Sequence, residues 1–87
     1  MNYEIRKSFI KDAAKLSAAT QKELAKIIEG LELATQLSEL KNCKKLKGVS
    51  TAYRIRLGQC RVCFFYENEI IELVRILARE DIYRYFP

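Results

Sequence analysis

The sequence predicts an α+β domain in which two helices pack on one face of a four-stranded, mainly antiparallel sheet. Three observations lead to this prediction. Apolar residues repeat at helical spacing in the first part of the chain. Three segments rich in β-branched and aromatic residues follow one another in the second part. The 87 residues, of which 49% are hydrophobic, suffice for one domain with one core over residues 1–87.

The first sixteen residues are expected to form a strand and a short helix. Tyr3 and Ile5 alternate with charged residues, which predicts a strand over residues 2–7. Ser8 is a residue type that favours a helix N-cap, and apolar residues at helical spacing follow it. A helix over residues 9–16 is therefore expected to begin after Ser8.

A longer helix is expected over about residues 18–36. Ser17 is a second candidate N-cap. Behind it, four apolar residues recur at i, i+3, i+4 and i+7, namely Leu24, Ile27, Ile28 and Leu31. The basic segment 38–50 shows neither the helical nor the strand periodicity of apolar residues, so we expect a loop with room for one helical turn.

Residues 51–57, 60–66 and 70–77 are predicted to be strands. Gly58-Gln59 separates the first two, and a glycine at the first central position indicates a type II′ hairpin turn. Asn68-Glu69 is a weaker turn signal between the second and third. The third strand is apolar on both faces, which is typical of an interior strand, and the tail 80–87 can form one or two helical turns.

The Gly58-Gln59 turn predicts the register of the first hairpin. Side chains opposite one another share a face, and faces alternate along each strand. The predicted pairs are Leu57–Cys60, Arg56–Arg61, Ile55–Val62, Arg54–Cys63 and Tyr53–Phe64. One face of the hairpin is then apolar and can pack on the helices, while the other gathers Arg54, Arg56 and Arg61.

The charge distribution points to an anionic partner. The net charge is +5, and no acidic residue occurs between Leu40 and Tyr66. Like charges opposite one another destabilise a strand pair, so stability alone does not favour three arginines on one face. An arginine cluster suits phosphate oxygens, whose geometry matches the planar guanidinium. Phosphates, acidic proteins and membrane surfaces are the usual partners, and a merely solvated basic face is the alternative.

Other chemistries find little support. Cys60 and Cys63 are three residues apart in a strand, so their side chains should point to opposite faces and serve packing. No histidine is present to complete a zinc site, and we expect no metal and no cofactor. Without histidine, Tyr83 and Tyr85 are candidates for acid–base work, the alternative being that both pack the tail.

The chain carries no targeting or membrane signal that we recognise. The first residues are charged and contain no apolar signal-peptide core, and no apolar run approaches the ~20 residues of a membrane span. Three cysteines are an odd number, which argues against a disulfide framework. We therefore expect a cytoplasmic protein that does not engage a membrane.

Four segments resemble the RelE/ParE superfamily of toxins from type II toxin–antitoxin modules, and within it the RelE-type mRNA interferases. They are Lys45-Leu46-Lys47-Gly48, Tyr53-Arg54-Ile55-Arg56-Leu57, Cys60-Arg61-Val62 and Arg79-Glu80-Asp81-Ile82-Tyr83. The resemblance covers nearly the whole chain and implies a RelE-like fold. It also implies a metal-independent endoribonuclease that cuts mRNA on the ribosome and inhibits translation, and a cognate antitoxin as partner.

The resemblance implies specific roles. The 2′-hydroxyl attacks the adjacent phosphate and leaves a 2′,3′-cyclic phosphate. The basic pair of the family corresponds to Arg54 and Arg56, and the arginine of the next strand to Arg61. The late arginine and the near-terminal tyrosine correspond to Arg79 and Tyr83. For such an enzyme, we expect Lys44, Lys45 and Lys47 of the acid-free segment to hold the ribosomal or messenger backbone without sequence specificity.

Two departures from the family pattern leave alternatives open. Ala78 stands where many relatives have histidine, and arginine replaces the lysines of the basic pair. Because arginine stays protonated, proton abstraction would fall to Tyr83, with Glu80 or Asp81 as substitutes. The alternatives are a ParE-like inhibitor of DNA gyrase without catalysis, a catalytically degenerate toxin, and a general basic RNA- or protein-binding domain.

Overall fold

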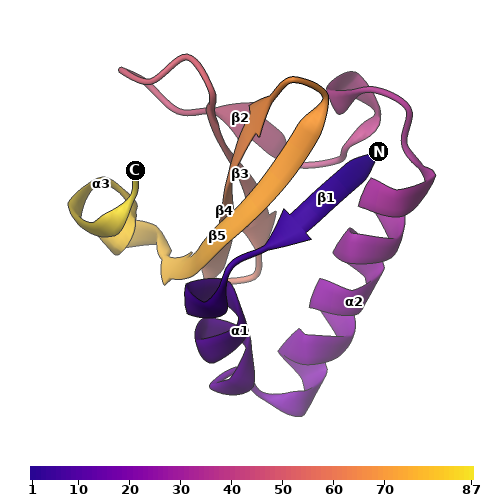
Figure 1. Cartoon of the computed structure of the whole chain (residues 1–87). Helices are drawn as coiled ribbons and strands as arrows, with labels where there is room; N and C mark the ends of the chain where they lie inside the picture. Colours follow the sequence, from indigo (N-terminus) through magenta and orange to yellow (C-terminus); the bar gives the residue numbers. More distant parts are fainter.

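The computed structural model describes residues 1–87 and contains a single mixed sheet. Its strands are β1 (Asn2–Ile5), β2 (Cys43–Lys45), β3 (Ala52–Leu57), β4 (Cys60–Glu67) and β5 (Ile70–Ala78). They lie in the order β1-β5-β4-β3-β2 (Figure 1). β1 runs parallel to β5, and the other neighbouring strands are antiparallel. The α+β class is confirmed, but the predicted number of four strands is wrong because the sheet has five.

The additional strand, β2, lies within the basic segment that was expected to be a loop. It has three residues, of which two are lysines, so its composition carries no strand signal. It pairs with the edge of β3, with Lys44 opposite Arg54. Its formation is decided by this tertiary pairing. The one helical turn expected in the segment is a 3₁₀ turn, η1 (Leu37–Glu39).

Two helices precede β2, α1 (Lys7–Ala14) and α2 (Ala18–Leu33), close to the predicted ranges. Ser17 is the N-cap of α2 as predicted, because its hydroxyl accepts a hydrogen bond from the Thr20 N–H at 3.2 Å. The prediction for Ser8 is wrong. α1 begins after Arg6, and Ser8 lies inside the helix, where its hydroxyl donates to the backbone carbonyl of Val74 in β5.

Helix α1 covers the part of β5 that β1 leaves unpaired. The β1–β5 ladder ends at Ile5 and Leu73. Beyond it, the Asp12 carboxylate accepts hydrogen bonds from the Ile76 N–H at 2.9 Å and from Nε of Arg75 at 2.8 Å. Side chains of α1 therefore satisfy backbone groups of a strand edge that would otherwise lack partners.

The sheet is packed on both faces. On one face, a core cluster joins sheet residues to Phe9 of α1 and to Leu24 and Leu31 of α2. On the other face, the chain after β5 forms a 3₁₀ turn, η2 (Arg79–Asp81), and a short helix, α3 (Ile82–Tyr85). In Figure 1, α2 and α3 flank the sheet from opposite sides.

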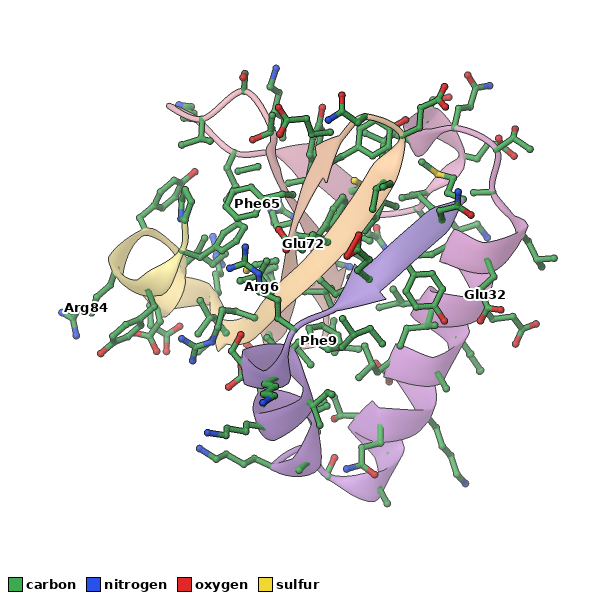
Figure 2. All side chains as sticks on the ribbon, in the orientation of Figure 1. Arg6, Phe9, Glu32, Phe65, Glu72 and Arg84 are labelled. Carbon is green, nitrogen blue, oxygen red and sulfur yellow. The ribbon has the colours of Figure 1, made fainter.

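Helix α3 closes a second core cluster. Its members are Leu46, Ala52, Cys63, Val74, Leu77, Ile82 and Phe86. Phe86 packs against Phe65 with ring centroids 4.9 Å apart, and Figure 2 shows Phe65 beside α3 and Phe9 at the top of α1. The expected tail is thus the cover of the second face. None of the helices combines the length and apolar character needed to cross a membrane.

The two hairpin turns, between β3 and β4 and between β4 and β5, are tight two-residue turns with positive φ values. All five predicted pairs between β3 and β4 are confirmed. Gly58 has a φ of +57°, whereas the φ of Gln59 is not positive, which is the pattern of a type II′ turn. In the β4–β5 turn, Asn68 and Glu69 have φ values of +53° and +63°, the type I′ pattern. β5 is an interior strand, as predicted.

Candidate functional site

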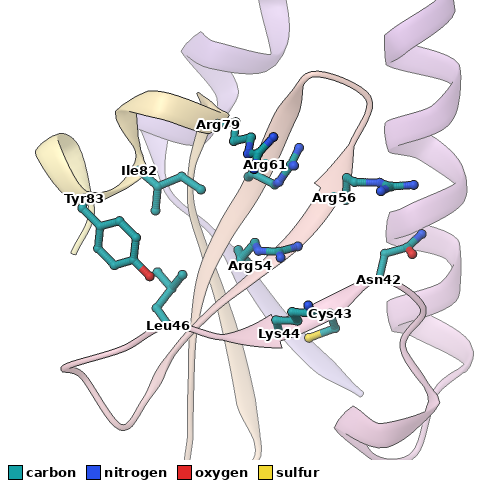
Figure 3. A pocket seen from close by; sticks show the side chains of 10 residues that line it. All are labelled: Asn42, Cys43, Lys44, Leu46, Arg54, Arg56, Arg61, Arg79, Ile82 and Tyr83. Carbon is teal, nitrogen blue, oxygen red and sulfur yellow. The ribbon is translucent and has the colours of Figure 1, made fainter.

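A concavity of about 770 Å³ opens on the sheet face that carries α3 (Figure 3). It lies between β2, the β3–β4 hairpin and the segment after β5. Its wall contains no carboxylate. The ten residues that line it are Asn42, Cys43, Lys44, Leu46, Arg54, Arg56, Arg61, Arg79, Ile82 and Tyr83. The five residues expected to be catalytic and one of the three expected RNA-binding lysines therefore lie together.

The strand register brings the basic side chains together. Arg54 and Arg56 are two residues apart in β3 and so share a face. Arg61 lies opposite Arg56 in the hairpin, and Lys44 of β2 lies opposite Arg54. Arg79 joins them from the end of β5, where its backbone N–H donates to the Gln59 carbonyl at 3.2 Å.

Arg61 is held more firmly than the other arginines. Its side chain is buried, with only 8% of the residue surface exposed. Nη1 donates to the carbonyl oxygens of Gly58 at 3.1 Å and Cys60 at 2.8 Å. Nε and Nη2 have no protein acceptor. The Arg61 guanidinium is therefore fixed in position by Nη1, while Nε and Nη2 can donate to a ligand.

The positive charge of the concavity is not balanced within the protein. Burial, and then the neighbouring Arg54, Arg79 and Arg56, lower the pKa of Arg61. The two ion pairs of the molecule, Arg6–Glu72 and Arg75–Asp12, involve none of these four arginines. A solvated basic face would not require a buried arginine without a carboxylate, so the geometry favours an anion-binding site.

The two candidate tyrosines differ in position. Tyr83 lines the concavity, is 67% exposed, and points its hydroxyl toward Leu46 in Figure 3. Tyr85 is 54% exposed and lies outside the concavity, with the guanidinium of Arg84 6.0 Å from its ring centroid. Ile82 and Phe86, and neither tyrosine, pack the tail onto the sheet. Tyr83 therefore remains available to a ligand.

Some predicted site residues lie elsewhere. Lys45 and Lys47 are exposed but do not line the concavity, and Lys45 lies opposite Tyr53 because it alternates with Lys44 in β2. Glu80 and Asp81 are also outside it. The lining residues that sequence reasoning missed are Asn42, Cys43, Leu46 and Ile82, and three of these belong to β2 and its flanks, which carried no strand signal.

The cysteines show no arrangement for redox or metal chemistry. Cys60 packs against the helix-side cluster and Cys63 belongs to the cluster under α3, so the two point to opposite faces as predicted. Burial raises the pKa of the Cys63 thiol to about 12. Burial also raises the pKa of Cys43, the thiol in the concavity. No three metal-ligating side chains of His, Cys, Asp or Glu lie together.

The structure defines a small α+β protein whose acid-free, arginine-lined concavity suits an anionic ligand. No protein-family model matches the chain. The chain is 37% identical over 82 residues, 93% of each protein, to Toxin RelE3 of Methanocaldococcus jannaschii. It is 33% identical over 85 residues to Putative toxin RelE1 of the same organism, covering 95% of this chain and 94% of that protein. The chain belongs to the RelE family of toxins.

Solved structures agree with this assignment. A chain of the RelB-RelE antitoxin–toxin complex from Methanococcus jannaschii superposes with a TM-score of 0.79 at 34% identity, covering 95% of this chain and 98% of that one. The isolated Escherichia coli RelE toxin gives a TM-score of 0.66 at 20% identity over 88% and 82% of the chains, a likeness of fold alone. The predicted RelE-like fold is confirmed.

Proposed function

We propose that this chain is the toxin of a type II toxin–antitoxin pair and that it cleaves mRNA on the ribosome without a metal ion, thereby inhibiting translation. Membership of the RelE family supports the toxin role. The cleavage rests on one observation, the convergence of four arginines and Tyr83 in a concavity without a carboxylate.

The arginines suit phosphoryl transfer. In the proposed reaction the 2′-hydroxyl of one nucleotide attacks the adjacent phosphorus, the bond to the 5′-oxygen of the next nucleotide breaks, and a 2′,3′-cyclic phosphate forms. Negative charge grows on the phosphoryl oxygens in the transition state. Arg61 and Arg79 stabilise that charge, and Arg54 and Arg56 position the phosphate through paired hydrogen bonds. Because carbonyl groups already hold Arg61, little reorganisation accompanies the reaction.

Proton transfer falls to Tyr83 in this mechanism. The arginines stay protonated and cannot abstract a proton. Burial raises the pKa of Cys43, so that thiol is a poor base near neutrality. Glu80 and Asp81 lie outside the concavity, whereas Tyr83 lines it. Its side chain is the proposed acid–base group: as phenolate it takes the proton of the 2′-hydroxyl, and as phenol it returns that proton to the departing 5′-oxygen.

The remaining basic residues bind the larger target. Lys44, at the concavity, and Lys45 and Lys47, beside it, contact messenger or ribosomal phosphates in this proposal, and such contacts weaken as salt rises. The positive charge of this surface would be complementary to an acidic segment of an antitoxin. RelE chains from Methanococcus jannaschii and Pyrococcus horikoshii were solved in complex with RelB, which supports such a partner here. The site of action is then the cytoplasm.

Single-turnover cleavage on ribosomes programmed with a defined mRNA tests this function. We expect a cut that leaves a 2′,3′-cyclic phosphate, and no cut in the same mRNA without ribosomes. Arg61→Ala should lower the rate at saturating ribosomes by ~10²–10³. Lys44→Ala should weaken binding and its salt dependence while the rate of the bound complex is kept. Lys11→Ala, on α1 away from the concavity, is the charge control. A wild-type rate for Arg61→Ala would contradict the mechanism.

A second candidate, a ParE-like inhibitor of DNA gyrase, is favoured by one observation. The chain has no histidine that could act as an acid–base group. This function needs binding and no proton transfer. Intact mRNA on saturated ribosomes, together with inhibition of purified gyrase in a supercoiling assay, would replace the first proposal with this one.

A further inference from the structure

A second groove, of about 440 Å³, adjoins the arginine-lined concavity. It lies between α2 and the segment from η1 to β2, and we name it the α2 groove. Its lining residues are Lys26, Ile27, Gly30, Glu39, Leu40, Lys41, Asn42, Ile55 and Arg56. Asn42 and Arg56 line both hollows. The two hollows therefore adjoin at these residues, beside the start of β2.

Arg56 marks the junction. Figure 3 shows its side chain directed toward α2, away from Arg61 and Arg79. It is exposed and forms no ion pair. An anion held by Arg61 and Arg79 is thus followed, in the direction of α2, by a further unpaired guanidinium.

The α2 groove is cationic in effect. Lys26 and Lys41 line it, and Glu39 is its one carboxylate. That carboxylate is already engaged, because Oε2 accepts hydrogen bonds from the Thr35 hydroxyl at 2.6 Å, the Thr35 N–H at 3.0 Å and the Gln36 N–H at 3.0 Å. Lys26, Lys41 and Arg56 outnumber this single carboxylate, so the groove carries a net positive charge that attracts an anion.

Toward β1, the sheet face that carries the arginine-lined concavity becomes acidic. A shallow hollow there is lined by Glu4, Glu67 and Glu72, together with Phe65, Asn68 and Ile70. RNA is a polyanion that must continue on both sides of the phosphate being cleaved. A strand leaving the concavity would be repelled at the acidic end and attracted into the α2 groove.

Gly30 is consistent with a ligand at this wall. It lies inside α2, where glycine is among the least favourable residues for a helix. A Cβ added to it would meet no atom within 4 Å, so packing does not require a glycine. Because Gly30 has no side chain, the wall that α2 contributes to the groove stays open to a ligand.

We propose that the α2 groove is a phosphate subsite for the mRNA nucleotide next to the one cleaved, with Lys26 and Lys41 contacting its backbone. This inference rests on the proposed function and adds a binding site outside the reacting centre. Asn42, shared by both hollows, offers an amide to the sugar or base between the two phosphates.

Neutralising single phosphates of the mRNA tests the subsite. A series of programmed ribosomes would carry one methylphosphonate at each position within two nucleotides of the cut. The Lys26→Ala/Lys41→Ala variant should bind ribosomes with the unmodified message more weakly than the wild-type protein. Because both lysines contact one phosphate of a single strand, its salt slope for binding should fall by about 0.7. On the message whose methylphosphonate replaces the phosphate next to the cut, the variant and the wild-type protein should bind equally well.

The control pair Lys11→Ala/Lys22→Ala removes the same charge from α1 and α2 outside both hollows. Gly30→Glu places a carboxylate in the groove and should weaken binding, whereas Gly30→Gln, of the same size, should weaken it less. Wild-type cleavage with equal effects of the two lysine pairs would overturn the subsite alone. The subsite would also be overturned if Lys26→Ala/Lys41→Ala bound more weakly than the wild-type protein on every modified message. Absence of wild-type cleavage would overturn the proposed function and the subsite with it.

Discussion

The guanidinium of Arg61 donates a hydrogen bond from Nη1 to the backbone carbonyl of Gly58, 3.1 Å away at the turn between β3 and β4. The same nitrogen donates to Cys60, and the Gln59 carbonyl accepts the N–H of Arg79. Three consecutive carbonyls therefore orient two of the proposed catalytic arginines. The conformation of the turn and the geometry of the site are linked.

Changing Gly58 should thus affect the chemical step. Gly58→Ala creates no clash, since a Cβ there meets nothing within 4 Å, but alanine is strained at a φ of +57° by about 1–2 kcal/mol. Relief of that strain would move the carbonyl that holds Arg61. We expect the single-turnover rate to fall on the order of 10²-fold with ribosome affinity kept. Gly48→Ala, at a φ of +90° away from Arg61, should lose stability only. Equal rate losses in both variants would disprove the link.

Tyr83→Phe separates proton transfer from stacking. The side chain is largely exposed and its hydroxyl bonds to no protein group, so the free energy of unfolding should change by less than about 0.5 kcal/mol. If the phenol transfers the proton, the rate falls by ~10²–10⁴ while the variant still sediments with ribosomes. Tyr85→Phe, outside the concavity, should cleave at the wild-type rate. Full activity of Tyr83→Phe would exclude Tyr83 as the acid–base group.

The β4–β5 turn stores strain that a glycine would remove. Type I′ turns favour Asn-Gly, yet here Glu69 follows Asn68 with a φ of +63°. Glu69→Gly should raise the free energy of unfolding by about 1 kcal/mol and the midpoint of thermal unfolding by about 4–8 °C. Glu69→Ala removes the charge and keeps the strain, so it should not stabilise. Calorimetry of both variants decides between strain and charge, and equal midpoints would contradict the strain argument.

Cys63 should make stability depend on alkaline pH. Burial raises the pKa of its thiol from 9.0 to about 12, so the folded protein favours the neutral form. The thiol of the unfolded chain ionises near pH 9, and its contribution to stability, complete below pH 9, is lost as the pH rises toward 12. Wild-type stability should therefore fall more steeply than that of Cys63→Ala across this window. Urea unfolding at several pH values measures both slopes, and parallel curves would refute the assignment. Cleavage by the variant should be unchanged.

Local patterns were enough to predict the arginine cluster. A two-residue turn at Gly58-Gln59 leaves one register for the hairpin, and strict alternation then places Arg54, Arg56 and Arg61 on one face. Arg79 had no such geometric warrant and was predicted through the family resemblance of the last segment. Tyr83 was a candidate because the chain has no histidine, and the resemblance then favoured it over Tyr85. The N-cap at Ser17 was also predictable, because its partner is only three residues away.

The sequence by itself therefore determined the α+β class, the hairpin register, the interior position of β5 and the family. Only the tertiary structure decided β2, the role of Ser8, the pairing of Arg75 with Asp12 and the cover that α3 forms over the second core cluster. Each of these depends on partners far along the chain: Val74 lies 66 residues from Ser8, and Arg75 lies 63 from Asp12. β2, with two lysines in three residues, forms because the edge of β3 supplies its hydrogen bonds. Local propensity has no access to such contacts, since their free energy appears only when the chain has folded.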